Sequence, residues 1–110
     1  MSDERRVSPR VTTHIVLEMM IVGEAKRYIG YVENLSESGI GIVSLEPLAT
    51  EKPVTLGFYV SDAAGKLSPT VSLVHTRIGP DTLYYHGFRF EQIRETERES
   101  ISQFIQEQLA

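Results

Sequence analysis

The chain has 110 residues, a formal net charge of −4 with its histidines neutral, and no cysteine. This length suits one domain with one core, and the missing cysteine excludes disulfides, thiolate metal sites and a cysteine nucleophile. The negative charge argues against a general nucleic-acid-binding protein, so we expect no DNA or RNA partner. Because no apolar run reaches about 18 residues and the N-terminus lacks a signal-peptide core, we expect a cytoplasmic protein without membrane insertion.

The chain begins with a segment rich in arginine. Arg5, Arg6 and Arg10 fall within six residues, and Pro9 disfavours helix at the residue before it. We therefore expect residues 1–12 to form a flexible, extended arm. An arginine side chain offers a planar fork of donors that fits phosphate and the O6/N7 edge of guanine, although such a cluster is also typical of a solvated tail.

Six segments then alternate apolar and polar residues, as half-buried β-strands do. The expected strands are residues 13–22, 27–35, 40–44, 54–60, 70–78 and 82–90. Turn signals rich in glycine, proline and aspartate separate most of them, about every ten residues. Strands this short and this regularly spaced predict a mainly β fold, an antiparallel barrel or sandwich.

A polar turn follows the second expected strand. Asn34, Ser36, Ser38 and Gly39 place an amide, two hydroxyls and a glycine within six residues. Short polar side chains at a strand end can hold a bound anion or the edge of a purine, or they can satisfy the backbone of the turn itself. The glycine indicates either a positive φ or the close approach of another group.

The period of the apolar residues changes at the end of the chain. They recur there at helical spacing, at Ile101, Phe104, Ile105 and Leu109. This spacing predicts one amphipathic helix over residues 97–109, with Thr96 and Glu99 as a capping box at its start. The apolar stripe must pack on something, either the open end of the barrel or another subunit. We expect the strands and the helix to form one domain over residues 13–110.

The residues give little support for catalysis or for a metal site. The sequence contains no G-x-S-x-G nucleophile elbow, phosphate loop or dinucleotide fingerprint, so we expect the protein not to be an enzyme. His75 and His86 could face each other on adjacent strands and bind zinc with a carboxylate. Histidines on neighbouring strands are more often ordinary barrel residues, so we expect no metal and no cofactor.

Two of these motifs, taken together, resemble the signature of the PilZ domain family. Arg6-x-x-x-Arg10 and the later Asn34-x-Ser36-x-x-Gly39 are similar to the family's RxxxR and D/N-x-S-x-x-G motifs and occur in the same order. The resemblance covers nearly the whole chain. It implies a six-stranded antiparallel β-barrel of the split-barrel type with one C-terminal helix, and a binding site for the bacterial second messenger cyclic di-GMP.

The resemblance also implies roles for individual residues. In the family, the arginines that match Arg6 and Arg10 hold phosphate and the Hoogsteen edge of guanine, and the turn lines the barrel against the other guanine. An arginine at the place of Arg5 tends to accompany an intercalated ligand dimer. The family pattern allows Asp or Asn at position 34, although a carboxylate would add an accepting oxygen and a charge. The implied ligand-binding residues are Arg5, Arg6, Arg10, Asn34, Ser36, Ser38 and Gly39.

The resemblance implies a stand-alone receptor or adaptor that passes the signal to an unidentified effector protein, as a monomer or a homodimer. Ligand would then clamp the arm onto the barrel. Two other interpretations stay open. One is a protein-interaction module of the same fold that does not bind nucleotide, against which the intact motifs count. The other is a small oligonucleotide-binding barrel that stacks bases on tyrosines, against which the acidic net charge counts.

Overall fold

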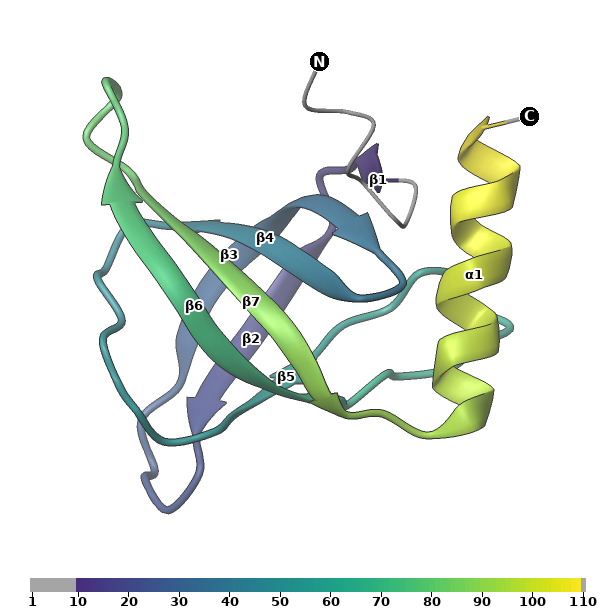
Figure 1. Ribbon diagram of the computed structural model, residues 1–110, viewed down its shortest axis with the longest axis horizontal. Coiled ribbons are helices and arrows are strands. Elements are labelled where there is room, and N and C mark those ends of the chain that lie inside the picture. The colour runs from purple at the N-terminus through teal and green to yellow at the C-terminus, as the bar shows by residue number, and fades with distance from the viewer. Residues whose placement is uncertain (1–9, 110) are drawn as a thin grey trace.

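Seven strands and one helix make up the part of the chain that the computed structural model describes, residues 10–109 (Figure 1). The strands are β1 (Arg10–Thr12), β2 (Val16–Ile21), β3 (Tyr28–Ser36), β4 (Gly39–Ser44), β5 (Val54–Gly57), β6 (Thr70–Ile78) and β7 (Tyr84–Gln92), and the helix is α1 (Glu95–Leu109). The alternation of apolar and polar residues places each strand close to where the sequence predicts it. The largest differences in the strands are at β2, which begins at Val16 rather than at residue 13, and at β5, which ends at Gly57 rather than at residue 60.

Six of the strands close into an antiparallel barrel. Neighbouring strands follow the order β3-β2-β5-β6-β7-β4, and β4 pairs back onto β3 to complete the ring. The predicted six-stranded antiparallel barrel with one C-terminal helix is therefore confirmed. Closure matters for the site, because it brings β3 and β4 from the first half of the chain beside β6 and β7 from the second half.

The first strand, β1, is an addition to the predicted six and corrects the expected boundary of the N-terminal arm. Arg10, Val11 and Thr12 pair antiparallel with residues 34–36 of β3. Val11 is buried and belongs to the apolar core, so residues 10–12 are part of the sheet and not of an arm that extends to residue 12. The remainder of the expected arm, with Arg5 and Arg6, lies outside the described residues.

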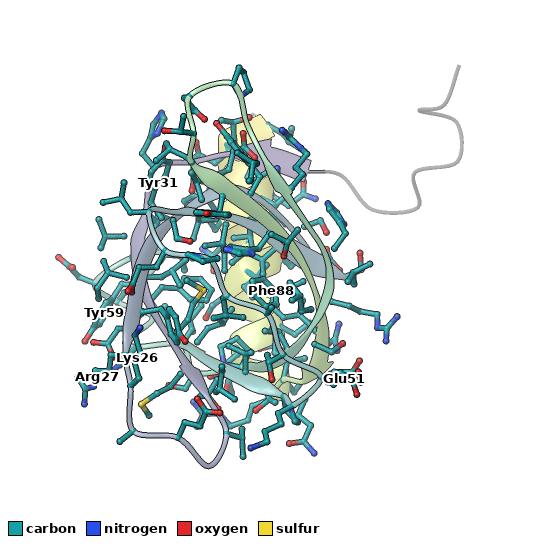
Figure 2. The ribbon with its side chains drawn as sticks, turned by 90° about the vertical axis from the view of Figure 1, so that its left-hand side faces the viewer. Lys26, Arg27, Tyr31, Glu51, Tyr59 and Phe88 are labelled. Atoms are coloured by element: carbon teal, nitrogen blue, oxygen red, sulfur yellow. The ribbon has the colours of Figure 1, made fainter. Side chains whose placement is uncertain are left out.

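The helix α1 stands beside the barrel, with β1 near its C-terminal end (Figure 1). Ile101 and Ile105 are 1% exposed and join the same core as the barrel interior, where Phe88 lies (Figure 2). The apolar stripe of the helix therefore packs on its own barrel, the first of the two possibilities that the sequence leaves open. Among the described residues, no helix has both the length and the hydropathy to cross a membrane.

The helix begins two residues before its predicted start, and a different pair of residues caps it. The buried carboxylate of Glu97 accepts hydrogen bonds from the backbone N–H of Arg94 at 3.1 Å and from that of Ser68 at 2.7 Å. Glu97 is thus the third residue of the helix and closes half of a capping box on Arg94. The predicted box on Thr96 and Glu99 is wrong, because the helix begins at Glu95 and Thr96 lies inside it, where it cannot act as the N-cap.

Candidate ligand-binding site

The polar turn lies beside residues from the far half of the chain, on the outer face of the barrel. One row of paired residues crosses four strands in the order Asn34, Gly41, Gly87 and His75. Residues paired across neighbouring strands share one face of the sheet. Because the two central positions are glycines, the side chains at the two ends of the row can lie over them, and the Asn34 amide and the His75 ring do so.

A groove with a volume of about 420 Å³ follows this row. The predicted site residues Asn34, Ser36, Ser38 and Gly39 all line it. The opposite wall comes from β6 and β7 and includes His75, Arg77, Tyr85 and Arg89. The sequence reasoning missed this second wall, because charged side chains on an alternating strand look like an ordinary solvated face.

Ser36 holds the turn together. Its hydroxyl oxygen accepts hydrogen bonds from the backbone N–H groups of Gly39 at 3.1 Å and Ser38 at 3.3 Å, and it is 5% exposed. The Ser38 hydroxyl lies 3.3 Å from the Ser36 hydroxyl at the exposed rim. Of the two roles that the sequence allows for these side chains, satisfying the backbone of the turn is the one seen for Ser36.

Gly39 is required by the close approach of two strands. Its φ is not in the left-handed region, and a Cβ at this position would lie 2.5 Å from the carbonyl oxygen of Phe88 on β7. Gly41 is crowded differently, because a Cβ there would lie 2.8 Å from the Asn34 side-chain oxygen. The Asn34 amide therefore lies over Gly41, within the groove.

Two bulges turn extra side chains toward the groove. The register shifts between Val32 and Asn34 in β3 and between Leu73 and His75 in β6. A bulge inserts one residue into a strand and re-aims its side chains. As a result, the consecutive residues Glu33 and Asn34 both line the groove, and on the other wall Val74 and His75 do the same.

The two walls of the groove differ in charge. Glu33 lies on the β3 side, and His75 and Arg77 lie on the β6 side. The Arg77 guanidinium stacks over the Tyr85 ring, 4.4 Å from its centroid. The Tyr85 hydroxyl donates to Asp81 at 2.6 Å, and this hydrogen bond raises the pKa of Tyr85 to about 12. Tyr85 therefore stays protonated and holds a fixed platform under Arg77.

Arg89 is a further cation at the rim, opposite Gly39 in the β4–β7 register. Its guanidinium donates to Glu91 from Nη2 at 3.0 Å and from Nε at 3.1 Å. The same Glu91 oxygen accepts from the Ser72 hydroxyl at 2.6 Å. The Ser72 and Arg89 hydrogen bonds hold the pKa of Glu91 below its ordinary value, so Arg89 keeps a charged partner while its side chain borders the groove.

The two histidines that could have shared a metal lie on opposite faces. His75 pairs with Gly87 on the outer face, whereas His86 is 2% exposed and its ring lies between the hydroxyls of Ser44 at 3.0 Å and Thr76 at 2.9 Å. Burial lowers the pKa of His86. Within residues 10–109, no group of three or more histidine, aspartate and glutamate residues could hold a metal ion.

The arginine motif meets the turn at its last residue. The backbone of Arg10 pairs with Ser36, so β1 begins beside the polar turn. Arg5 and Arg6 are outside the described residues. The structure therefore brings together one end of the arginine motif with Asn34, Ser36, Ser38 and Gly39.

The family model described as PilZ domain matches residues 4–107 of the chain. No curated protein sequence matches it significantly.

Several solved structures share its fold. The inhibitor of motility MotI/DgrA from Bacillus subtilis has a TM-score of 0.75 and 16% identity, over 96% of this chain and 52% of that one. The PilZ domain of YcgR from Escherichia coli with c-di-GMP has a TM-score of 0.73 and 14% identity, over 96% and 92%. The K. pneumonia MrkH-c-di-GMP complex has a TM-score of 0.76 and 14% identity, over 96% and 52%. The chain thus spans about half the length of MotI/DgrA and MrkH.

Proposed function

The chain belongs to the PilZ domain family, and we propose that it is a receptor that binds cyclic di-GMP in the groove over β3, β4, β7 and β6. The observation that carries the proposal is the pairing of Arg10 with Ser36, which joins the two family motifs at one edge of the groove. Two of the similar structures named above are complexes with this ligand. Their low identity to this chain makes them support for the fold, and the motifs support the ligand.

The chemistry of the groove suits the ligand. Cyclic di-GMP carries two phosphates and two guanines, so its binder needs cationic forks and short polar groups. We assign the phosphate and guanine contacts to Arg6 and Arg10, with Arg5 stacking on a second, intercalated ligand. Although the protein has a net charge of −4, Arg77 places a positive charge at the groove itself, and Arg89 borders the groove with its charge paired to Glu91.

The turn supplies the contacts to the other guanine. The carbonyl oxygen of Asn34 can accept a hydrogen bond from a base, and the exposed hydroxyl of Ser38 can reach a phosphate or a sugar. Ser36 acts by holding the turn. The Asn34 amide lies over Gly41 and the His75 ring lies over Gly87, so a flat base bound here would stack on these two groups.

We propose that the output is transmitted to a separate effector protein. Residues before β1 would fold over the bound ligand and change the surface beside the turn. One contact could extend this change, because the Ser102 hydroxyl of α1 donates to the Glu37 carboxylate of the turn at 2.9 Å. The face of α1 that does not pack on the barrel is therefore our candidate surface for the effector.

Calorimetric titration of the full chain with cyclic di-GMP tests the proposal. We expect saturable binding, with GTP as a ligand that does not compete. Arg10→Ala should weaken binding by roughly 10- to 100-fold, because a charged bidentate contact contributes about 1–3 kcal/mol. A stoichiometry of two ligands per chain would support the role of Arg5.

The matched control is Arg27→Ala, which removes the same charge from an exposed position that does not line the groove (Figure 2). It should bind as the unmodified protein does. If the unmodified chain gives no heat and no shift in melting temperature at high ligand concentration, the receptor proposal is wrong, and the protein-interaction module becomes the better account.

A further inference from the structure

Glu33 occupies an unusual position in the groove. The bulge in β3 leaves it without a partner on β4, while its carbonyl oxygen still accepts the Thr13 N–H at 2.9 Å. Its backbone is thus fixed, and its half-buried side chain lines the groove directly beside Asn34. One carboxylate oxygen of Glu33 lies 3.5 Å from the Asn34 side-chain nitrogen. The sequence motif includes Asn34 but not Glu33.

Guanine has two neighbouring hydrogen-bond donors, and the single accepting oxygen of Asn34 does not satisfy both. The Watson–Crick edge of guanine presents two neighbouring donors, N1–H and the N2 amino group. A carboxamide offers one accepting oxygen and one donating NH₂ group, whereas a carboxylate offers two accepting oxygens and a charge. Glu33 is the carboxylate beside the Asn34 amide in the lining of the groove, so it can accept both donors of a base bound there.

The opposite wall fits the other edge of the same base. Arginine forks match the O6 and N7 acceptors of guanine, and Arg77 lies on the β6 side with its guanidinium over the Tyr85 ring. The groove is thus acidic on one wall and basic on the other. Guanine is likewise divided, with donors on one edge and acceptors on the other. Adenine lacks this division, because its N1 is an acceptor and would face the Glu33 carboxylate.

We infer that Glu33 accepts hydrogen bonds from N1–H and the N2 amino group of one guanine of the bound cyclic dinucleotide, and that it makes the groove specific for guanine over adenine. This inference rests on the proposed function and assigns the ligand specificity of the same groove. Glu33 therefore acts as a ligand-binding residue, in addition to the residues of the family motif.

The test is a calorimetric titration of the unmodified chain and of Glu33→Gln with three ligands: cyclic di-GMP, cyclic di-AMP and cyclic di-IMP, which lacks the N2 amino group. The unmodified chain should bind cyclic di-GMP at least roughly 10-fold more tightly than cyclic di-IMP, and cyclic di-AMP more weakly still. Glu33→Gln should lose roughly 10- to 100-fold for cyclic di-GMP. Its preference for cyclic di-GMP over cyclic di-IMP should also shrink, because a carboxamide has one accepting oxygen and can accept from only one of the two guanine donors at a time.

Glu51→Gln is the matched control, because it removes the same charge from an exposed loop position, labelled in Figure 2, that does not line the groove. It should keep all three affinities. If the unmodified chain binds none of the ligands, the proposed function fails. If it binds cyclic di-GMP and cyclic di-IMP equally, or if Glu33→Gln keeps the unmodified preference between them, the receptor stands and the role of Glu33 is refuted. The comparison of cyclic di-GMP with cyclic di-IMP on the unmodified chain needs no variant, so it can refute the role of Glu33 even if Glu33→Gln does not fold.

Discussion

Single residues of the polar turn serve the fold and the proposed site at the same time. Ser36 is almost fully buried, and its hydroxyl oxygen accepts hydrogen bonds from two backbone N–H groups. Gly39 is needed because the Phe88 carbonyl oxygen fills the space of its Cβ. Substitution of either residue therefore disturbs the turn before it disturbs a ligand, and loss of binding in such variants does not by itself identify a contact.

A pair of glycine substitutions separates these two effects. Gly39→Ala should lower the free energy of unfolding by about 1–3 kcal/mol, because its new methyl group meets backbone that cannot move aside. Gly41→Ala meets only the Asn34 side chain, which can rotate away. We expect it to keep most of its stability and to lose affinity for cyclic di-GMP. Urea unfolding and calorimetry measure the two quantities, and a Gly41→Ala variant that unfolds as readily as Gly39→Ala would contradict the distinction.

Among single residues, the sequence predicted those of the groove that lie close together in the chain and form a motif. Asn34, Ser36, Ser38 and Gly39 lie within six residues, and all four line the groove. Arg77 and Arg89 were not predicted as site residues, because they reach the groove only through the register of β6 and β7 with β4. Glu33 was missed because a bulge, and not the alternation of the strand, turns it outward.

At the scale of elements, Glu97 fixes where α1 begins and joins it to the segment before β6. Its carboxylate accepts from the Ser68 N–H, the Arg94 N–H and the Arg94 guanidinium. Burial alone would raise the pKa of Glu97, but these hydrogen bonds outweigh burial and hold the pKa below its ordinary value. The ionised carboxylate is therefore the form that stabilises the folded protein.

This pKa shift predicts the pH dependence of stability. A carboxyl group with a lowered pKa in the folded state contributes its stabilisation above the unfolded pKa, near 4.3 for glutamate, and loses it as pH falls through the folded value. At pH 7, Glu97→Gln should be less stable than the unmodified chain by about 1–3 kcal/mol. The difference should shrink as the pH is lowered from 5 toward 3. Unfolding curves at several pH values measure it, and a constant difference would contradict the role of the charge.

The approximate positions of the six barrel strands could be predicted from the sequence. The start of α1 and the presence of β1 could not, for a physical reason. Alternation with a period of two follows from burial of one face, and it is visible in single sequences. The start of α1 depends on Ser68, 29 positions before Glu97, and β1 forms because Val11 finds the core next to β3. Such contacts between distant segments leave no local pattern.

At the scale of the whole molecule, barrel closure is what makes the groove. β3 and β4 carry the polar turn, β6 and β7 carry the cationic wall, and β4 pairs with β3 on one side and with β7 on the other. Arg10, the first residue of β1, pairs with Ser36 of the turn. A ligand in the groove would therefore contact both halves of the chain, which suits the proposed receptor.

The measurement that tests this account most directly is a titration of the ¹⁵N-labelled full chain with cyclic di-GMP, followed by amide chemical shifts. A base stacked on the Asn34 amide and the His75 ring should shift the amides of Gly41 and Gly87 beneath them, and that of Ser38 at the rim, through its ring current. The amides of Gly23 and Gly65, in turns that do not line the groove, should stay in place. Shifts at those two turns but not at Gly41 and Gly87, or no shifts at all, would contradict binding in this groove.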